Sequence, residues 1–179
     1  MDPVTIAAAG AVLALGGTAY AVWASRAKQR ALGGPRLTLS TTPYAFGEAV
    51  PCRVSSVVRA PIRVERVRFQ LSCSEAVTWT ETVRRGGKTR RVQRSQSETV
   101  WSAEAVAPIG RELRKGERFE AEADLKLPEE GGPTFTAPHN SVGWQVAFVV
   151  DDTTGGIARG AEMLIVEPRR RSVVPGARR

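Results

Sequence analysis

The residues that could perform chemistry are few in this chain, and their spacing fits no reaction centre. His139 is the only histidine, which rules out a multi-histidine metal site, and we also predict no Ser-His-Asp triad. Cys52 and Cys73 lack the CxxC spacing of zinc ligands. The run 85–89 (RGGKT) ends like a phosphate-binding loop, but it lacks the first glycine and the following helix. We therefore predict a protein that is not an enzyme and has no cofactor and no metal site.

The acidic pairs and the two thiols have ordinary structural interpretations. Oxygen ligands in two predicted loops could meet a hard cation, but the spacing of an EF-hand is absent. Cys52 and Cys73 alternate in phase with apolar neighbours, which favours buried thiols, and a disulfide in an oxidising compartment is the alternative. His139 is predicted to be a surface or loop-packing residue. Solvated loop charges are predicted at Glu129, Glu130, Asp151 and Asp152.

Positive charge is concentrated in three short segments. The chain has 26 lysines and arginines against 18 acidic residues, which gives a net charge of +8. Such clustering predicts local basic patches rather than a uniformly nucleic-acid-like surface. The three clusters are Arg26, Lys28, Arg30 and Arg36; Arg84, Arg85, Lys88, Arg90, Arg91 and Arg94; and Arg169, Arg170, Arg171, Arg178 and Arg179.

The middle cluster surrounds Gly86-Gly87, and this pair predicts a β-hairpin. A type I′ turn needs positive φ at both central residues, which glycine adopts freely. We predict that the six bases from Arg84 to Arg94 bind an acidic protein surface or anionic lipid. The alternative is a solvated edge hairpin that its charges protect from aggregation. Trp79 and Trp101 lie on the two arms, where they could pair across the strands.

The segment 3–24 contains no charged residue and predicts a transmembrane helix. At ~1.5 Å per residue it spans roughly 33 Å, enough for a hydrocarbon core of about 30 Å. Alternatives are a cleaved signal peptide and a buried helix of a soluble protein. Arg26, Lys28 and Arg30 follow the helix, so the positive-inside rule predicts an N-out, single-pass protein of a bacterial inner membrane with its main domain in the cytoplasm. Small residues at four-residue spacing would permit a homodimer.

From residue 37 the apolar residues alternate with period two, and no segment after residue 32 shows helical periodicity. Roughly eight short strands with regular turns, one of them at 108–110, predict an all-β protein with an immunoglobulin-like antiparallel β-sandwich. The predicted organisation is a transmembrane helix at 1–24, a basic linker at 25–36, the sandwich at 37–168 and a basic disordered tail at 169–179. The candidate core residues are Phe119, Leu125 or Leu127, Trp144 and Val146.

Several short motifs resemble the arrestin-like β-sandwich proteins, which include a bacterial sporulation-control group and the related retromer subunits. They are a Pro-Tyr-x-x-Gly-Glu turn at 43–48, a Leu-Arg-Lys-Gly-Glu turn at 113–117, Leu127-Pro128 before an acidic loop, and Ser141-Val142-x-Trp144 before a strand. The resemblance covers residues 37 to 168. It implies protein-binding and scaffolding roles and no catalytic residues. Those families usually have two sandwiches, whereas this chain has room for one.

We therefore expect a membrane-anchored adaptor that binds protein partners, or an anionic lipid surface, through exposed edge strands and the basic hairpin. Strand addition at an edge is one route to a partner, and the 128–141 loop is a further binding candidate. One alternative is a nucleic-acid-binding protein that uses the hairpin and the tail, although these basic segments contain no aromatic residue for base stacking. The other alternative is an exported envelope domain with a Cys52–Cys73 disulfide.

Overall fold

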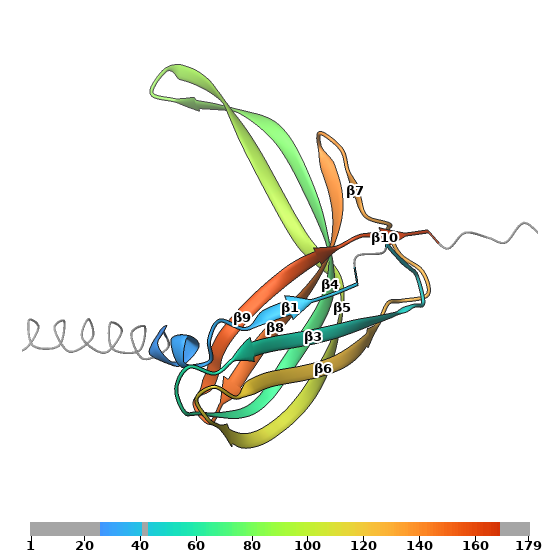
Figure 1. Cartoon of the computed structure of the whole chain (residues 1–179). Coiled ribbons are helices and arrows are strands. Elements are labelled where there is room, and N and C mark those ends of the chain that lie inside the picture. Colours follow the sequence, from blue (N-terminus) through green and yellow to red (C-terminus); the bar gives the residue numbers. More distant parts are fainter. Residues whose placement is uncertain (1–25, 41–42, 169–179) are drawn as a thin grey trace, which may run out of the picture.

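The structure, a computed structural model, describes residues 26–40 and 43–168 (Figure 1). Within these ranges, helical residues at 26–31 precede ten strands. No helix within these ranges is long and apolar enough to cross a bilayer. The predicted anchor at 3–24 and the predicted tail at 169–179 lie outside the described residues. The strands are β1 (Arg36–Thr38), β2 (Tyr44–Ala45), β3 (Ala49–Val57), β4 (Ile62–Arg85), β5 (Lys88–Leu113), β6 (Arg118–Lys126), β7 (Phe135–Thr136), β8 (Asn140–Asp152), β9 (Gly155–Leu164) and β10 (Val166–Glu167).

Two antiparallel sheets pack face to face, which confirms the all-β prediction. One sheet has the order β1-β3-β6, and the other has the order β5-β4-β8 with β9 beyond β8. β7 pairs with the start of β8, and β10 pairs with β2 in a small parallel ribbon. Figure 1 shows β1, β3 and β6 lying across β4, β5, β8 and β9.

Alternating side chains from both sheets form one core. Val50, Cys52 and Val54 of β3 alternate inward, and Phe69 and Leu71 of β4 face them from the other sheet. A strand places every second side chain on one face, so the period-two pattern predicts this layer. The predicted core residues Phe119, Leu125, Leu127, Trp144 and Val146 are all buried.

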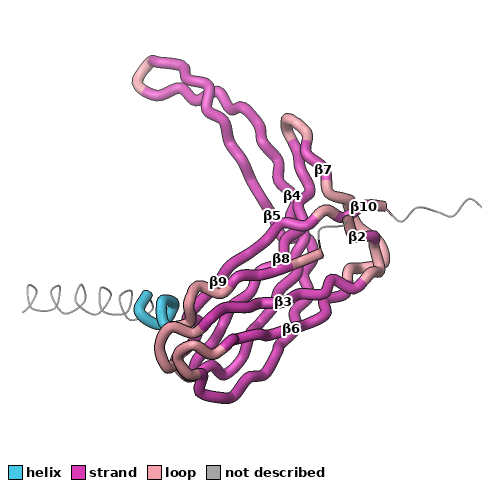
Figure 2. The backbone as a smooth tube through the Cα atoms, viewed as in Figure 1, coloured by secondary structure: helices cyan, strands magenta, loops and turns pink. Residues whose placement is uncertain are grey.

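Strands β4 and β5 form a hairpin that extends well beyond the end of β8, the neighbouring strand of their sheet. The sequence predicts two shorter strands between Ile62 and Val83, but β4 is continuous for 24 residues and β5 for 26. The last residue of β4 that pairs with β8 is Val77, opposite Asn140, so the remaining ladder has two strands only. Figures 1 and 2 show this part projecting away from the sandwich.

The ladder between β4 and β5 contains two β-bulges. In the first, Ile109 and Gly110 lie opposite Glu65, so the predicted turn at 108–110 is wrong. Pro108 is tolerated there because β5 is an edge strand and Pro108 lies beside a bulge. In the second bulge, Cys73 pairs with Trp101 and Ser74 pairs with Thr99, which leaves Val100 without a partner. A bulge of this kind bends and twists the strand.

The predicted basic linker is a helix and a turn that dock on the sandwich. Leu32 is fully buried, and its carbonyl oxygen accepts a 2.7 Å hydrogen bond from Ser56 Oγ. The Ala31 carbonyl accepts the backbone N–H of Arg59 at 2.7 Å. Gly33 has φ +83°, and a Cβ at this position would lie 1.9 Å from the Val57 carbonyl oxygen. Only glycine fits this approach, so the entry to the sandwich is tightly specified.

Candidate functional site

The six predicted binding bases all lie at the distal end of the β4–β5 hairpin. Arg85 pairs with Lys88 across the tip, and Gly86 and Gly87 have φ values of 58° and 77°. The predicted two-residue turn with positive φ is therefore confirmed. Among the described side chains of this cluster only Arg94 has an ion pair, with Glu81 at 3.0 Å. Both side chains of that pair are about half exposed, so its contribution to stability is small.

The distal hairpin, residues 77–96, has one apolar face and one polar face. The register places Trp79 opposite Arg94 and Val83 opposite Arg90. Because side chains alternate along a strand, these pairs share one face with Val77, Glu81, Val92 and Lys88. The opposite face carries Thr78 opposite Ser95, Thr80 opposite Gln93, and Thr82 opposite Arg91. We call the first the apolar face, made of Val77, Trp79, Val83 and Val92 with the bases Lys88, Arg90 and Arg94.

The apolar face is open to solvent, which the sequence pattern did not lead us to expect. Val77, Trp79 and Val92 have 51%, 42% and 36% of their surface exposed. Alternation of Val77, Trp79 and Val83 with three threonines could have revealed this face. The basic segments themselves contain no aromatic residue, but the register places Trp79 of β4 opposite Arg94.

Trp144 holds the hairpin base to the core. The predicted cross-strand pair of Trp79 and Trp101 is wrong, because the β5 bulge and the ladder place Trp101 opposite Cys73. Trp101 instead packs on Trp144, with ring centroids 5.6 Å apart and planes at 51°. Phe46 meets Trp144 edge-on at 5.9 Å, and Trp144 Nε1 donates a 2.9 Å hydrogen bond to the Gly132 carbonyl. The hairpin base, the β2 turn and the 128–141 loop therefore share one aromatic anchor.

Two of the four acidic residues are structural, in contrast to the predicted solvated charges. Asp151 is only 3% exposed and accepts hydrogen bonds from Arg68 Nε at 2.7 Å and Arg66 Nε at 3.0 Å. The Arg68 hydrogen bond, helped by Arg66 against the effect of burial, holds the pKa of Asp151 below its usual value. Asp152 accepts a 2.5 Å hydrogen bond from Lys28. Burial opposes the shift, but hydrogen bonds from Lys28 and Thr154 lower the pKa of Asp152.

The other acidic residues and the histidine lie near the surface. Glu129 forms a 3.0 Å ion pair with Lys126, and Glu130 is exposed. His139 is exposed in the loop, as predicted, and its carbonyl accepts the Thr78 backbone N–H at 2.7 Å. Within residues 26–40 and 43–168, no group of three or more His, Cys, Asp or Glu residues could hold a metal ion.

Both cysteines are buried free thiols, which confirms the favoured prediction over a disulfide. Cys52 lies on β3 and Cys73 on β4, in different sheets. Burial, and secondarily Asp124, raises the pKa of Cys52 to about 12. Burial and then Glu75 raise the pKa of Cys73. Because the thiolate is the reactive species, both groups should be inert in the folded protein.

The predicted membrane-flanking bases lie on the 26–31 helix at the end of the sandwich. Lys28 binds Asp152 and also donates a 2.8 Å hydrogen bond to Thr154 Oγ1. Arg26 and Arg30 remain exposed and line a shallow pocket together with Arg59. The structure therefore divides the three flanking bases between one structural contact and two surface charges.

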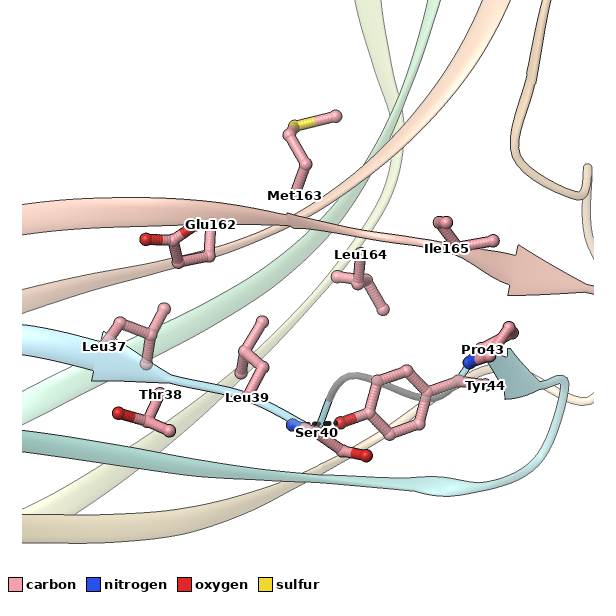
Figure 3. A pocket seen from close by; sticks show the side chains of 10 residues that line it. All are labelled: Leu37, Thr38, Leu39, Ser40, Pro43, Tyr44, Glu162, Met163, Leu164 and Ile165. Atoms are coloured by element: carbon pink, nitrogen blue, oxygen red, sulfur yellow. Dashed lines mark hydrogen bonds between the residues drawn. The ribbon is translucent and has the colours of Figure 1, made fainter.

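The sandwich is open along one side, between β1 and β9. A groove of about 430 Å³ runs between these strands and includes Leu39, Tyr44, Glu162 and Leu164 (Figure 3). Figure 3 shows Glu162 turned toward β1 and Met163 turned away from the groove. An inward-pointing charge on an edge strand discourages random strand pairing. This edge remains a place where a selected partner could add a strand.

The 128–141 loop is well connected to the body. Thr134 N–H donates a 2.9 Å hydrogen bond to the Val166 carbonyl, and Val166 N–H returns a 2.9 Å bond to Thr134 Oγ1. Phe135 pairs with Val142 and is 40% exposed. The loop therefore presents one exposed aromatic residue from an ordered frame.

The solved structures with similarity to this chain include one sporulation control protein. No family model and no curated protein matches the sequence. The sporulation control protein Spo0M from Bacillus subtilis is similar over 74% of this chain and 48% of its own, with 17% identity and a TM-score of 0.45. The chain thus spans about half the length of that protein. Assignment to the all-β class stands on the strands of the chain itself.

Proposed function

We propose that the chain is a non-enzymatic, arrestin-like adaptor that residues 3–24 anchor in a membrane, with the sandwich on the cytoplasmic side. The projecting β4–β5 hairpin is the observation that carries this proposal. A two-stranded ribbon without a third strand is marginally stable by itself, so its length adds little to the fold. Its bases and exposed apolar side chains are available for contact with a partner.

The sandwich supplies what an adaptor needs besides a contact arm. Two exposed edges, β1 and β9, can receive an extended segment of a protein partner through main-chain hydrogen bonds. The acids that were candidates for chemistry instead hold the frame, since Asp151 and Asp152 bind Arg66, Arg68 and Lys28. The arrestin-like assignment rests on the turn and strand motifs of residues 37–168 together with the two packed sheets.

The buried free thiols favour a reducing compartment over the exported alternative. Exposed Arg26, Arg30 and Arg59 gather where the chain enters the sandwich, which suits the cytoplasmic face of a membrane. Protease protection of the full chain in spheroplasts, with a cytosolic reporter as the control, tests this topology. Cleavage of the sandwich by protease added outside would refute the cytoplasmic placement.

Site-specific photo-crosslinking of the full chain in its native host tests the adaptor role. A photoreactive side chain at Val92 on the hairpin or at Met163 on β9 should yield an adduct with a defined protein. A photoreactive side chain at Lys126 on β6 is the control for random encounters. If neither position gives a protein adduct beyond the level of the control, the adaptor role is wrong.

A further inference from the structure

We infer that the apolar face of the distal hairpin docks on the headgroup layer of an anionic lipid bilayer. This inference rests on the proposed function and names the partner of the same hairpin. Val77, Trp79, Val83 and Val92 would enter the boundary between headgroups and acyl chains, while the neighbouring bases meet lipid phosphates. Among the described side chains, the bases on this face are Lys88, Arg90 and Arg94.

Folding does not explain the apolar face. Beyond Val77 the ribbon no longer pairs with β8. Trp79 and Val92 therefore do not belong to the core of the protein. Protection of an edge from aggregation explains the bases, but it would favour polar residues in place of a tryptophan and three valines. The opposite face of the same ribbon has such residues, because it carries threonine, serine, glutamine and the bases Arg84 and Arg91 and no apolar side chain. The apolar side chains are therefore segregated on one side.

Charge complementarity identifies the kind of surface that this face fits. Residues 77–96 contain six bases and one acid, Glu81, which Arg94 already binds. An anionic surface is therefore favoured. Tryptophan beside arginine, with valines that bury without hydrogen bonds, is the composition of a segment that lies in a membrane interface. Nucleic acid would offer the valines no partner, because binding of single strands depends on stacking with aromatic residues.

The position of the hairpin is compatible with contact between one membrane and two basic regions, the distal hairpin and the 26–31 helix. The hairpin leaves the sandwich at the end opposite the 26–31 helix, and its distal part then runs toward the side on which the helix lies (Figure 1). In the view of Figure 1 the tip and the helix lie toward the same side of the molecule. Arg26 and Arg30 on the helix and the bases of the hairpin could thus face one anionic leaflet.

A pair of adjacent cysteine substitutions tests the inference with a matched control. Val92→Cys lies on the apolar face and Gln93→Cys on the polar face of the same strand. Each can be labelled with an environment-sensitive dye, because the native thiols are buried. The full-length chain is reconstituted in phosphatidylcholine vesicles with or without phosphatidylglycerol. The dye at position 92 should shift to the blue in anionic vesicles and be quenched by doxyl-labelled lipid, whereas the dye at position 93 should not.

The bases supply a second readout. Replacing Lys88 or Arg90 with Gln should lower the ratio of docked to free hairpin about fivefold each, which corresponds to the roughly 1 kcal/mol that one base contributes near an anionic leaflet. High salt should lower it further. Near-ultraviolet circular dichroism checks that Trp144 keeps its packing in every variant.

Three results would overturn the inference. One is an equal response at positions 92 and 93, and another is a response that does not depend on phosphatidylglycerol. The third is a shift at position 92 without lipid that grows with protein concentration, because a second copy would then cover this face. A protein adduct in the crosslinking experiment, together with any of these results, would leave the adaptor role standing without lipid docking.

Discussion

Trp101 packs on Trp144 at the point where the hairpin leaves the sandwich, with their ring centroids 5.6 Å apart. One ring belongs to the edge strand β5 and the other to the interior strand β8. The contact ties the hairpin base to the core through a side chain that is partly buried. Stability of the body and activity of the distal hairpin should therefore respond to different tryptophans.

Trp101→Ala should lower the free energy of unfolding by about 2 kcal/mol, since it removes a large, partly buried ring. Trp79→Ala removes an exposed ring and should change it by less than about 0.5 kcal/mol. Chemical denaturation of the full chain in detergent measures both. A double-mutant cycle with Trp144→Phe should show a coupling of about 0.5–1.5 kcal/mol for Trp101. Equal effects of the two single substitutions would contradict this division of roles.

Protonation of Asp151 should lower the free energy of unfolding at acid pH. Its pKa is lower in the folded protein than the value of about 3.9 in an unfolded chain. Its ion pairs therefore stabilise the protein above that unfolded value, and this contribution is lost as the pH falls through the folded pKa. Asp151→Asn should cost about 2 kcal/mol at neutral pH, with the loss disappearing in acid. Unfolding curves at neutral and acidic pH measure the change.

Removing the arginines should be more harmful than removing the carboxylate. The double variant Arg66→Gln and Arg68→Gln leaves a buried carboxylate without its cations, which costs about 3–5 kcal/mol. The pKa of Asp151 should rise in this variant. The loss of free energy of unfolding should therefore be largest at neutral pH and shrink on acidification. Arg63→Gln, on the exposed Arg63–Glu65 pair, is the matched control and should have little effect. A defect of equal size for both arginine variants would speak against the buried network.

Gly33→Ala should disrupt the docking of the 26–31 helix, while Gly34→Ala should be tolerated better. Both glycines have positive φ, but only Gly33 would place a Cβ against the Val57 carbonyl. The shared conformational penalty is about 1–2 kcal/mol, and the clash at Gly33 adds to it. Hydrogen exchange at Leu32 and Arg59 measures the docking directly. Equal protection in the two variants would show that the turn can relax at no cost.

Cys52 and Cys73 should not react with a thiol reagent in the folded full-length chain at pH 8. With the pKa of Cys52 at about 12, very little thiolate is present at that pH. Both thiols should react rapidly in denaturant, and the protein should migrate alike on gels with and without reductant. Rapid labelling of either residue in the native state, or a mobility shift, would contradict the buried free thiols.

Local patterns predict the body of this protein well. Period-two alternation identifies β3, β4 and β8, and it places Phe119 and Trp144 in the core. The Gly86-Gly87 pair predicts the hairpin tip because its conformational requirement is local. The positions of the bases follow from the same turn.

Features that depend on tertiary partners are the ones that sequence reasoning missed. Asp151 looks like a loop acid until the fold brings Arg66 and Arg68 to it from another strand. The Trp79–Trp101 pair fails because one bulge and the ladder decide which residues meet. The length of the hairpin is missed for a related reason, since alternation does not tell where the supporting strand β8 stops.

The unpaired Val100 sets a rule for how the hairpin can change in length during evolution. Its bulge shifts the register of β5 by one residue between the part that pairs beside the sandwich and the part that pairs beside Trp79. An insertion of one residue in each arm would keep the strands paired, but the apolar face would then lie on the opposite side of the hairpin relative to the sandwich. An insertion of two in each arm would preserve it. Relatives that use the same side of the hairpin should therefore differ in arm length by even numbers, unless they gain or lose a bulge.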